Sequence, residues 1–224
     1  MSIARANHER LLAVNPRAEV PVLVDGDVTV VNSSDIVAYL DLAYPERPIH
    51  PADLKARVAA RALERLADTR VDAILLDCSI WTWAERSDPP LPGLHEAGQR
   101  DLGTIFERIE TTLAGFPTPL PFGHWTIAEF AFWPHLAALR PLKFSLDGEK
   151  YPRLDAWFAA MRSDAVFLDD ARRTTAFMKA IGSNTDFERT KLFWRGDRIE
   201  WLLARGFHDW FFAEIKAGRT LWPE

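Results

Sequence analysis

The chain has one cysteine in 224 residues, no long apolar segment and no excess of basic residues. The single cysteine, Cys78, excludes a disulfide within the chain and fits a reducing compartment, so we expect a cytoplasmic protein. No run of about 18 apolar residues occurs, which predicts no membrane-spanning helix. The N-terminus also lacks the apolar core of a secretory signal peptide. The net charge of −5 argues against a general nucleic-acid-binding protein.

Motifs of several enzyme classes are missing as well. The six histidines show no metal-ligand spacing, so we predict no metal site. Neither a Gly-x-Ser-x-Gly motif nor a phosphate-binding glycine loop occurs. Cys78 lies on the apolar stripe of a predicted helix, which favours a buried apolar role over that of a reactive thiol. His208 and Asp209 are neighbours in sequence and would point to different faces of a helix, which argues against an acid–base pair.

Tryptophan is the residue type that stands out by its abundance. Nine tryptophans and a hydrophobic content of 48% predict wide aromatic packing surfaces. A chain of this length can bury a sizeable core in one or two domains.

The stretch from Asn15 to Tyr39 carries the clearest local pattern. Two valine-rich runs, Val20–Val24 and Val28–Val31, flank an Asp-Gly turn and predict a β-hairpin. Pro21 cannot donate to a strand ladder, so it must lie at the beginning of its strand or on an open edge. Directly after the second run come N-cap residue types and then apolar residues at helical spacing.

A proline-rich break at residues 45–51 marks the best domain boundary, and the chain after it has helical periodicity. One stripe of apolar residues at helical spacing predicts a long helix that ends near Trp81 and Trp83. A second amphipathic helix is expected from Leu94 to Leu113. The residues of the first stripe are Leu63, Leu66, Ala67, Val71, Ile74, Leu75 and Cys78.

Two further helix starts have specific signals. Thr126 and Glu129 match a capping box, and Trp125 with Phe130 matches a hydrophobic staple. Proline also opens the segment 151–157, a position that the first turn of a helix tolerates.

A last stripe predicts one more helix in the C-terminal extension. We expect Gly206 to mark close approach to another helix, and Gly218 to end this one. The stripe consists of Ile199, Leu202, Leu203, Gly206, Phe207, Trp210, Phe211 and Ile215.

The sequences NPRAEVPVLVDGD and NSSDIVAYLD, the Thr-x-x-Glu box and YPRLxxW together resemble the glutathione S-transferase family. The resemblance implies an α+β fold in which a truncated thioredoxin-like α/β segment precedes an all-α domain with an extra helical tail. The corresponding domains are residues 1–46, 51–182 and 183–224.

The resemblance also implies a set of binding residues. The backbone of Val20 would hold the cysteinyl part of glutathione beside Pro21 as a cis-proline, and Asn32 and Ser33 would hold the γ-glutamyl end. A helix N-terminus with free N–H groups suits a carboxylate. Trp81, Trp83 and Trp125 are candidates for an electrophile pocket, with ordinary core packing as the alternative for each.

The implied activity is conjugation of glutathione, as co-substrate and without a metal, to a small apolar electrophile by a cytoplasmic homodimer. Only fourteen residues precede Asn15, too few for the strand, helix and strand that carry the thiol-activating residue in the family. We therefore expect a truncated first domain and assign no catalytic residue. Two alternatives stay open, which are a non-catalytic binding or scaffold protein and an active enzyme whose assigned start lies too far downstream.

Overall fold

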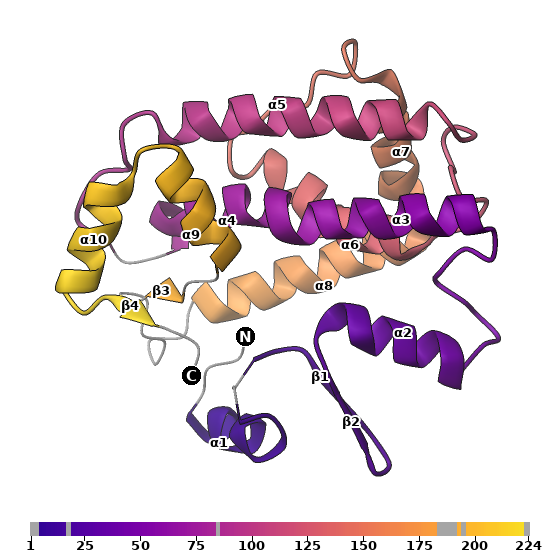
Figure 1. Cartoon of the computed structure of the whole chain (residues 1–224), viewed down its shortest axis with the longest axis horizontal. Coiled ribbons are helices and arrows are strands. Elements are labelled where there is room, and N and C mark those ends of the chain that lie inside the picture. Colours follow the sequence, from indigo (N-terminus) through magenta and orange to yellow (C-terminus); the bar gives the residue numbers. More distant parts are fainter. Residues whose placement is uncertain (1–4, 17–18, 84–85, 183–191, 194–195, 222–224) are drawn as a thin grey trace.

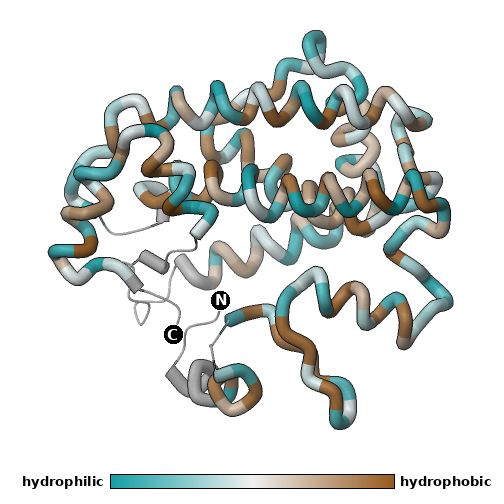
Figure 2. The backbone as a smooth tube through the Cα atoms, in the orientation of Figure 1, coloured by the Kyte–Doolittle hydropathy of each residue, from teal (hydrophilic) through white to brown (hydrophobic). Residues whose placement is uncertain are grey.

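The structure is a computed structural model that describes residues 5–16, 19–83, 86–182, 192–193 and 196–221. It is rich in helices, and a small hairpin unit lies beside a larger helical body (Figure 1). In Figure 2 hydrophilic and hydrophobic residues alternate along the two helices over residues 54–66 and 94–113, a pattern typical of helices that bury one side. Over the described ranges, no helix combines the length and apolarity needed to cross a membrane.

The predicted hairpin is present between α1 (Arg5–Val14) and α2 (Ser33–Ala43). Strands β1 (Val22–Asp25) and β2 (Val28–Val31) pair antiparallel, with Asp25 opposite Val28 across a two-residue turn. Gly26 has a φ of 60°, a left-handed conformation that glycine adopts without a Cβ clash. β1 begins at Val22 rather than Val20, because Pro21 cannot donate to the ladder.

Asp41 of α2 fixes the segment that leads into the helical body. Its carboxylate accepts the backbone N–H groups of Ile49 and His50 at 2.7 and 2.8 Å, and lies 2.6 Å from the His50 ring Nδ1. Burial alone would raise the pKa of Asp41, but these hydrogen bonds outweigh it and lower the pKa. The proline-rich connection is therefore held at its end by one buried carboxylate.

The predicted long helix runs from residue 54 to residue 83 and contains an irregular turn. α3 (Leu54–Leu66) passes into a π-helical turn, η1 (Ala67–Val71), and then into α4 (Asp72–Trp83). The Thr69 hydroxyl donates to the Arg65 carbonyl at 2.7 Å within this turn. No sequence signal predicted the π turn, which rotates the side chains of α4 relative to a regular helix.

Four more helices complete the body, and they are α5 (Leu94–Leu113), α6 (Ile127–Leu139), α7 (Pro152–Ser163) and α8 (Ala165–Gly182). In Figure 1 the long helix lies between α5 and α8. The core gathers apolar side chains from all of these elements. Its largest fully buried members are Trp157, Phe106, Phe132, Phe167, Leu63, Ile74, Ile80, Leu102, Ile109, Leu154 and Met161.

The predicted capping box forms at the start of α6 and is fully buried. The Thr126 N–H donates to Glu129 Oε2 at 2.8 Å, and the Ala128 N–H donates to Thr126 Oγ1 at 3.3 Å. Glu129 also accepts the Trp157 indole N–H at 2.7 Å, so the cap joins α6 to α7. Burial raises the pKa of Glu129 despite these donors.

The tail differs from the single helix that its apolar stripe predicted. Its described residues form two helices, α9 (Gly196–Ala204) and α10 (His208–Lys216), with a break at Gly206, whose φ is 84°. A Cβ at Gly206 would meet nothing within 4 Å, so the expected close approach to another helix was wrong. Left-handed glycine lets the next N–H groups cap the carbonyls that end α9.

Two short features close the tail. Gly218, also left-handed, ends α10 as predicted. Strands β3 (Leu192–Phe193) and β4 (Thr220–Leu221) then pair in parallel, a contact that the helical stripe did not predict.

Candidate functional site

The four residues that the resemblance assigned to ligand binding lie together at one corner, where the beginning of β1 meets the N-terminus of α2. The Asn32 N–H donates to the Pro21 carbonyl at 3.3 Å, which closes the corner. Val20, Pro21, Asn32 and Ser33 are all exposed there. The Val20–Pro21 peptide bond is cis, as the resemblance implied.

The side chain of Asn32 caps the N-terminus of α2. Asn32 has a φ of 80°, and its side-chain oxygen accepts the Ser34 N–H at 2.9 Å. The Ser33 hydroxyl has no hydrogen-bond partner among the described residues and faces solvent. An exposed hydroxyl at the positive end of a helix dipole is suited to an incoming carboxylate.

Asn15 supports the other side of the corner and was not singled out from the sequence. Its side chain is buried, and its amide Nδ2 donates to the Glu19 carbonyl at 2.9 Å. This bond joins Asn15 to Glu19, the residue that directly precedes Val20. The asparagine stands in the quoted motif, but only the structure shows that it contacts Glu19.

Glu64 of α3 holds the beginning of α2 on the helical body. It is 3% exposed, accepts a hydrogen bond from the Ser34 hydroxyl and pairs with Arg61. A glutamate within the apolar stripe was the only sequence signal for this contact. Because the Ser34 hydroxyl is engaged, it is not free to act on a ligand.

Two tyrosines clamp the hairpin onto α2. The hydroxyls of Tyr39 and Tyr44 donate to Asp25 Oδ2 at 3.0 and 2.7 Å. These hydrogen bonds to a carboxylate raise the pKa of both phenols. Both tyrosines are thus structural clamps rather than sources of a phenolate.

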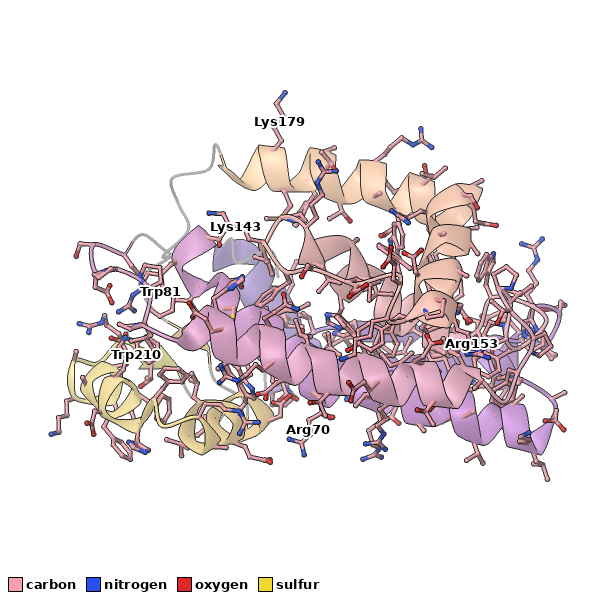
Figure 3. All side chains as sticks on the ribbon, turned by 90° about the horizontal axis from the view of Figure 1, so that it is seen from above. Arg70, Trp81, Lys143, Arg153, Lys179 and Trp210 are labelled. Atoms are coloured by element: carbon pink, nitrogen blue, oxygen red, sulfur yellow. The ribbon has the colours of Figure 1, made fainter. Side chains whose placement is uncertain are left out.

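The predicted electrophile-pocket tryptophans are not gathered at this corner. Trp125 donates its indole N–H to Asp164 at 2.9 Å and packs perpendicular to Phe167. Trp81 packs against Trp210 of the tail, with ring centroids 5.5 Å apart (Figure 3). The side chain of Trp83 lies outside the described residues.

The long helix separates Trp81 from the corner. Trp81 lies seventeen positions after Glu64, which contacts the beginning of α2. At 1.5 Å per residue this is about 25 Å. An extended tripeptide spans only about 10 Å, so a ligand held at the corner would not reach Trp81.

Trp81 instead lines a separate cavity of about 440 Å³ together with Cys78, His95 and Lys143. Burial raises the pKa of the Cys78 thiol to about 12, so this thiol is protonated and unreactive. Within the part of the chain that the structure describes, no three His, Cys, Asp or Glu side chains form a metal-binding group.

Comparison with known proteins identifies two family models. Residues 2–48 match "Glutathione S-transferase, N-terminal domain", and residues 92–160 match "Glutathione S-transferase, C-terminal domain". Together these two matches span more than half of the chain.

Individual relatives agree with these matches. Glutathione S-transferase Z1 of Arabidopsis thaliana is 52% identical over 44 residues, 20% of each protein. Glutathione S-transferase omega-1 of Mus musculus is 26% identical over 153 residues, 68% of this chain and 60% of that protein. The chain thus matches about a fifth of the first relative and three fifths of the second.

A solved structure shares the fold. It is a glutathione S-transferase from Methylobacillus flagellatus KT with glutathione bound, 25% identical to this chain, with a TM-score of 0.57. The match covers 75% of this chain and 84% of that chain.

Proposed function

This chain belongs to the glutathione S-transferase family, and we propose that it binds glutathione at the corner formed by Val20, Pro21, Asn32 and Ser33. The bound thiol is then conjugated to a small apolar electrophile. The glutathione-bound structure of a relative with the same fold supports this choice of ligand.

The observation that carries the proposal is the hydrogen bond between the Asn32 N–H and the Pro21 carbonyl. It holds an exposed strand beginning and an exposed helix N-terminus at one point. The backbone at Val20 is available to pair with an extended peptide, as an open strand edge does. The Ser33 hydroxyl and the amides of the first turn of α2 are placed to receive a carboxylate.

Conjugation requires a thiolate. Its sulfur attacks the electrophilic carbon, a C–S bond forms, the leaving group departs and the thiol proton passes to a base. A free thiol has a pKa of about 8.5 and is mostly protonated near neutral pH. We assign no activating residue, because the Ser34 hydroxyl is held by Glu64 and the Cys78 thiol has a pKa of about 12.

The same observation favours a second candidate function, that of a non-catalytic glutathione-binding or scaffold protein. The corner supplies groups that can bind glutathione but none assigned to activate its thiol. The nearby hydroxyls of Tyr39 and Tyr44 donate to the Asp25 carboxylate. Under this second candidate we expect weak glutathione binding and little conjugation by this 224-residue chain.

The family resemblance and the surface of α2 and α3 support a cytoplasmic homodimer. Leu42, Leu54 and Val58 are 84%, 78% and 70% exposed. Leu42 and Val58 border a hollow of about 680 Å³ between α2 and α3. Contact with the same face of a second copy would remove this apolar surface from water.

A calorimetric titration combined with a conjugation assay tests the proposal. Wild-type protein, Ser33→Ala and the control Ser163→Ala, an exposed serine remote from the corner, are titrated with glutathione. We expect Ser33→Ala to weaken binding about tenfold through loss of a hydrogen bond to a charged group, and Ser163→Ala to change nothing. Equal binding by all three proteins would contradict the proposal that glutathione binds at this corner.

The conjugation assay uses glutathione and an aryl halide with the same three proteins. Turnover by the wild type well above the uncatalysed rate, together with lower turnover by Ser33→Ala, would establish the transferase. Binding without turnover would establish the non-catalytic alternative.

A further inference from the structure

A second cleft lies where η1, α5 and the tail helix α9 meet, and it shares no residue with the glutathione corner. Its volume is about 290 Å³. We propose that this cleft binds a small organic carboxylate with a flat apolar body.

Two arginines at the cleft are available for a carboxylate. Arg108 of α5 has no side-chain partner among the described residues. Among the residues that the structure describes, Arg70 of η1 pairs only with Glu200, at 3.4 Å, and both side chains are more than half exposed. Such a surface pair is weak, so an incoming carboxylate can replace it. Figure 3 shows Arg70 projecting beside the tail.

The other charges of the cleft have partners of their own. Asp101 accepts the Arg205 Nε–H at 2.6 Å and the Trp201 indole N–H at 2.8 Å. Asp197, the second carboxylate of the cleft, also has an interaction within the protein. The positive potential that remains therefore belongs to Arg70 and Arg108, whose planar guanidinium groups match a carboxylate.

The floor of the cleft is apolar. Ile74, Ile105 and Trp201 line it and are buried in the body. A volume of about 290 Å³ is at the lower end of ligand cavities, which restricts the ligand to about one ring. Apolar walls beneath two cations select an amphipathic anion over a bare inorganic one.

The π turn gives an independent indication. It supplies Thr69 and Arg70 to the cleft, at a point where a regular helix would have continued. Single π turns within α-helices are rare and occur frequently at functional sites. Here the turn is held by the hydrogen bond from the Thr69 hydroxyl to the Arg65 carbonyl.

Calorimetric titration of the full chain with benzoate tests the site, with benzyl alcohol as the neutral analogue. We expect benzoate to bind with a dissociation constant on the order of 0.1–1 mM, as befits a one-ring ligand, and benzyl alcohol to bind much more weakly. Arg108→Gln and Arg70→Gln should each weaken benzoate binding about tenfold. Arg172→Gln, an exposed arginine on α8, is the matched control and should have no effect.

Three results with benzoate and benzyl alcohol would overturn the proposal. They are no benzoate binding by the wild type up to about 10 mM, equal binding of benzyl alcohol, and unchanged binding in both cleft variants. Inorganic phosphate binding as tightly as benzoate would also contradict the ligand class, because it would show that the apolar floor is not used. Ser33→Ala should leave benzoate binding intact, which separates this site from the glutathione corner.

Discussion

Gly98 and Gly103 lie five residues apart on α5 in very different surroundings. A Cβ at Gly98 would be 3.1 Å from Cys78 Sγ and from Phe144 Cζ, whereas one at Gly103 would be 3.7 Å from the Tyr151 hydroxyl. Alanine improves helix propensity by about 1 kcal/mol, but overpacking a core costs about 1–3 kcal/mol. We expect Gly103→Ala to stabilise the protein by up to about 1 kcal/mol and Gly98→Ala to destabilise it by about 1 kcal/mol. Urea unfolding measures both, and shifts of the same sign would contradict the close packing of α4 on α5.

Thr126 is a second residue whose substitution has a defined effect. Thr126→Ala removes the acceptor for the Ala128 N–H and one donor to buried Glu129, and should cost about 1–2 kcal/mol. Thermal unfolding measures the loss. Thr111→Ala on the exposed face of α5, where the hydroxyl bonds its own helix, is the control. A Thr126→Ala protein as stable as this control would mean that the cap contributes nothing.

Local signals at single residues were readable from the sequence, and long-range partners were not. Capping residues such as Thr126 act within one turn, so their spacing predicts their contacts. Glu64 and Ser34 meet across 30 positions, and no spacing rule links them. Only the folded structure therefore shows which residues support the corner.

At the scale of elements, the helix periods were predicted and the breaks within them were not. The stripe from Ile199 to Ile215 continues on one face, so periodicity alone could not locate the break at Gly206. The π turn at residues 67–71 is hidden in the same way, because one extra residue changes the face but not the apolar composition.

Glu214 of α10 is one of the buried carboxylates that hold the tail on the helical body. It receives both terminal nitrogens of Arg86 at 2.8 and 3.0 Å and also pairs with Arg219. Burial would raise its pKa, but the hydrogen bonds from Arg86 and Arg219 lower it from 4.5 to about 2. Because the folded-state pKa is depressed, this stabilisation is present above about pH 4.5 and is lost as the pH falls toward 2.

We therefore expect the wild-type melting temperature to fall between pH 5 and pH 3 by more than that of Glu214→Gln. The variant already lacks the ion pair, and should be less stable than the wild type at pH 7. Glu107→Gln, which removes an exposed pair with Lys150, should follow the wild type. Parallel pH profiles for the wild type and Glu214→Gln would contradict the depressed pKa.

At the scale of the whole molecule, the order of most helices and strands could be predicted from the sequence. The hairpin, the capped helix after it and the helical body are present as predicted. The relative positions of distant side chains did not follow, and Trp81 shows why. Its place on the helix was predictable, but its contact with Trp210 depends on how the tail folds back.

The proposed homodimer is also a property of the whole molecule. Val58→Glu places a charge in the exposed apolar face of α2 and α3 and should give a monomer. Val166→Glu on α8, where the valine is 54% exposed, is the matched control and should remain dimeric. Sedimentation velocity distinguishes these outcomes. A Val58→Glu protein that remains dimeric would place the interface elsewhere.

The central claim is that glutathione binds where the beginning of β1 meets the N-terminus of α2. The most direct test is a two-dimensional amide NMR titration of the labelled chain with glutathione. The account predicts concentration-dependent shifts in the amides of Val20, Val22 and residues 32–35, with those around Arg108 unchanged. Shifts confined to other parts of the molecule, or no shifts at glutathione concentrations of about 10 mM, would contradict it.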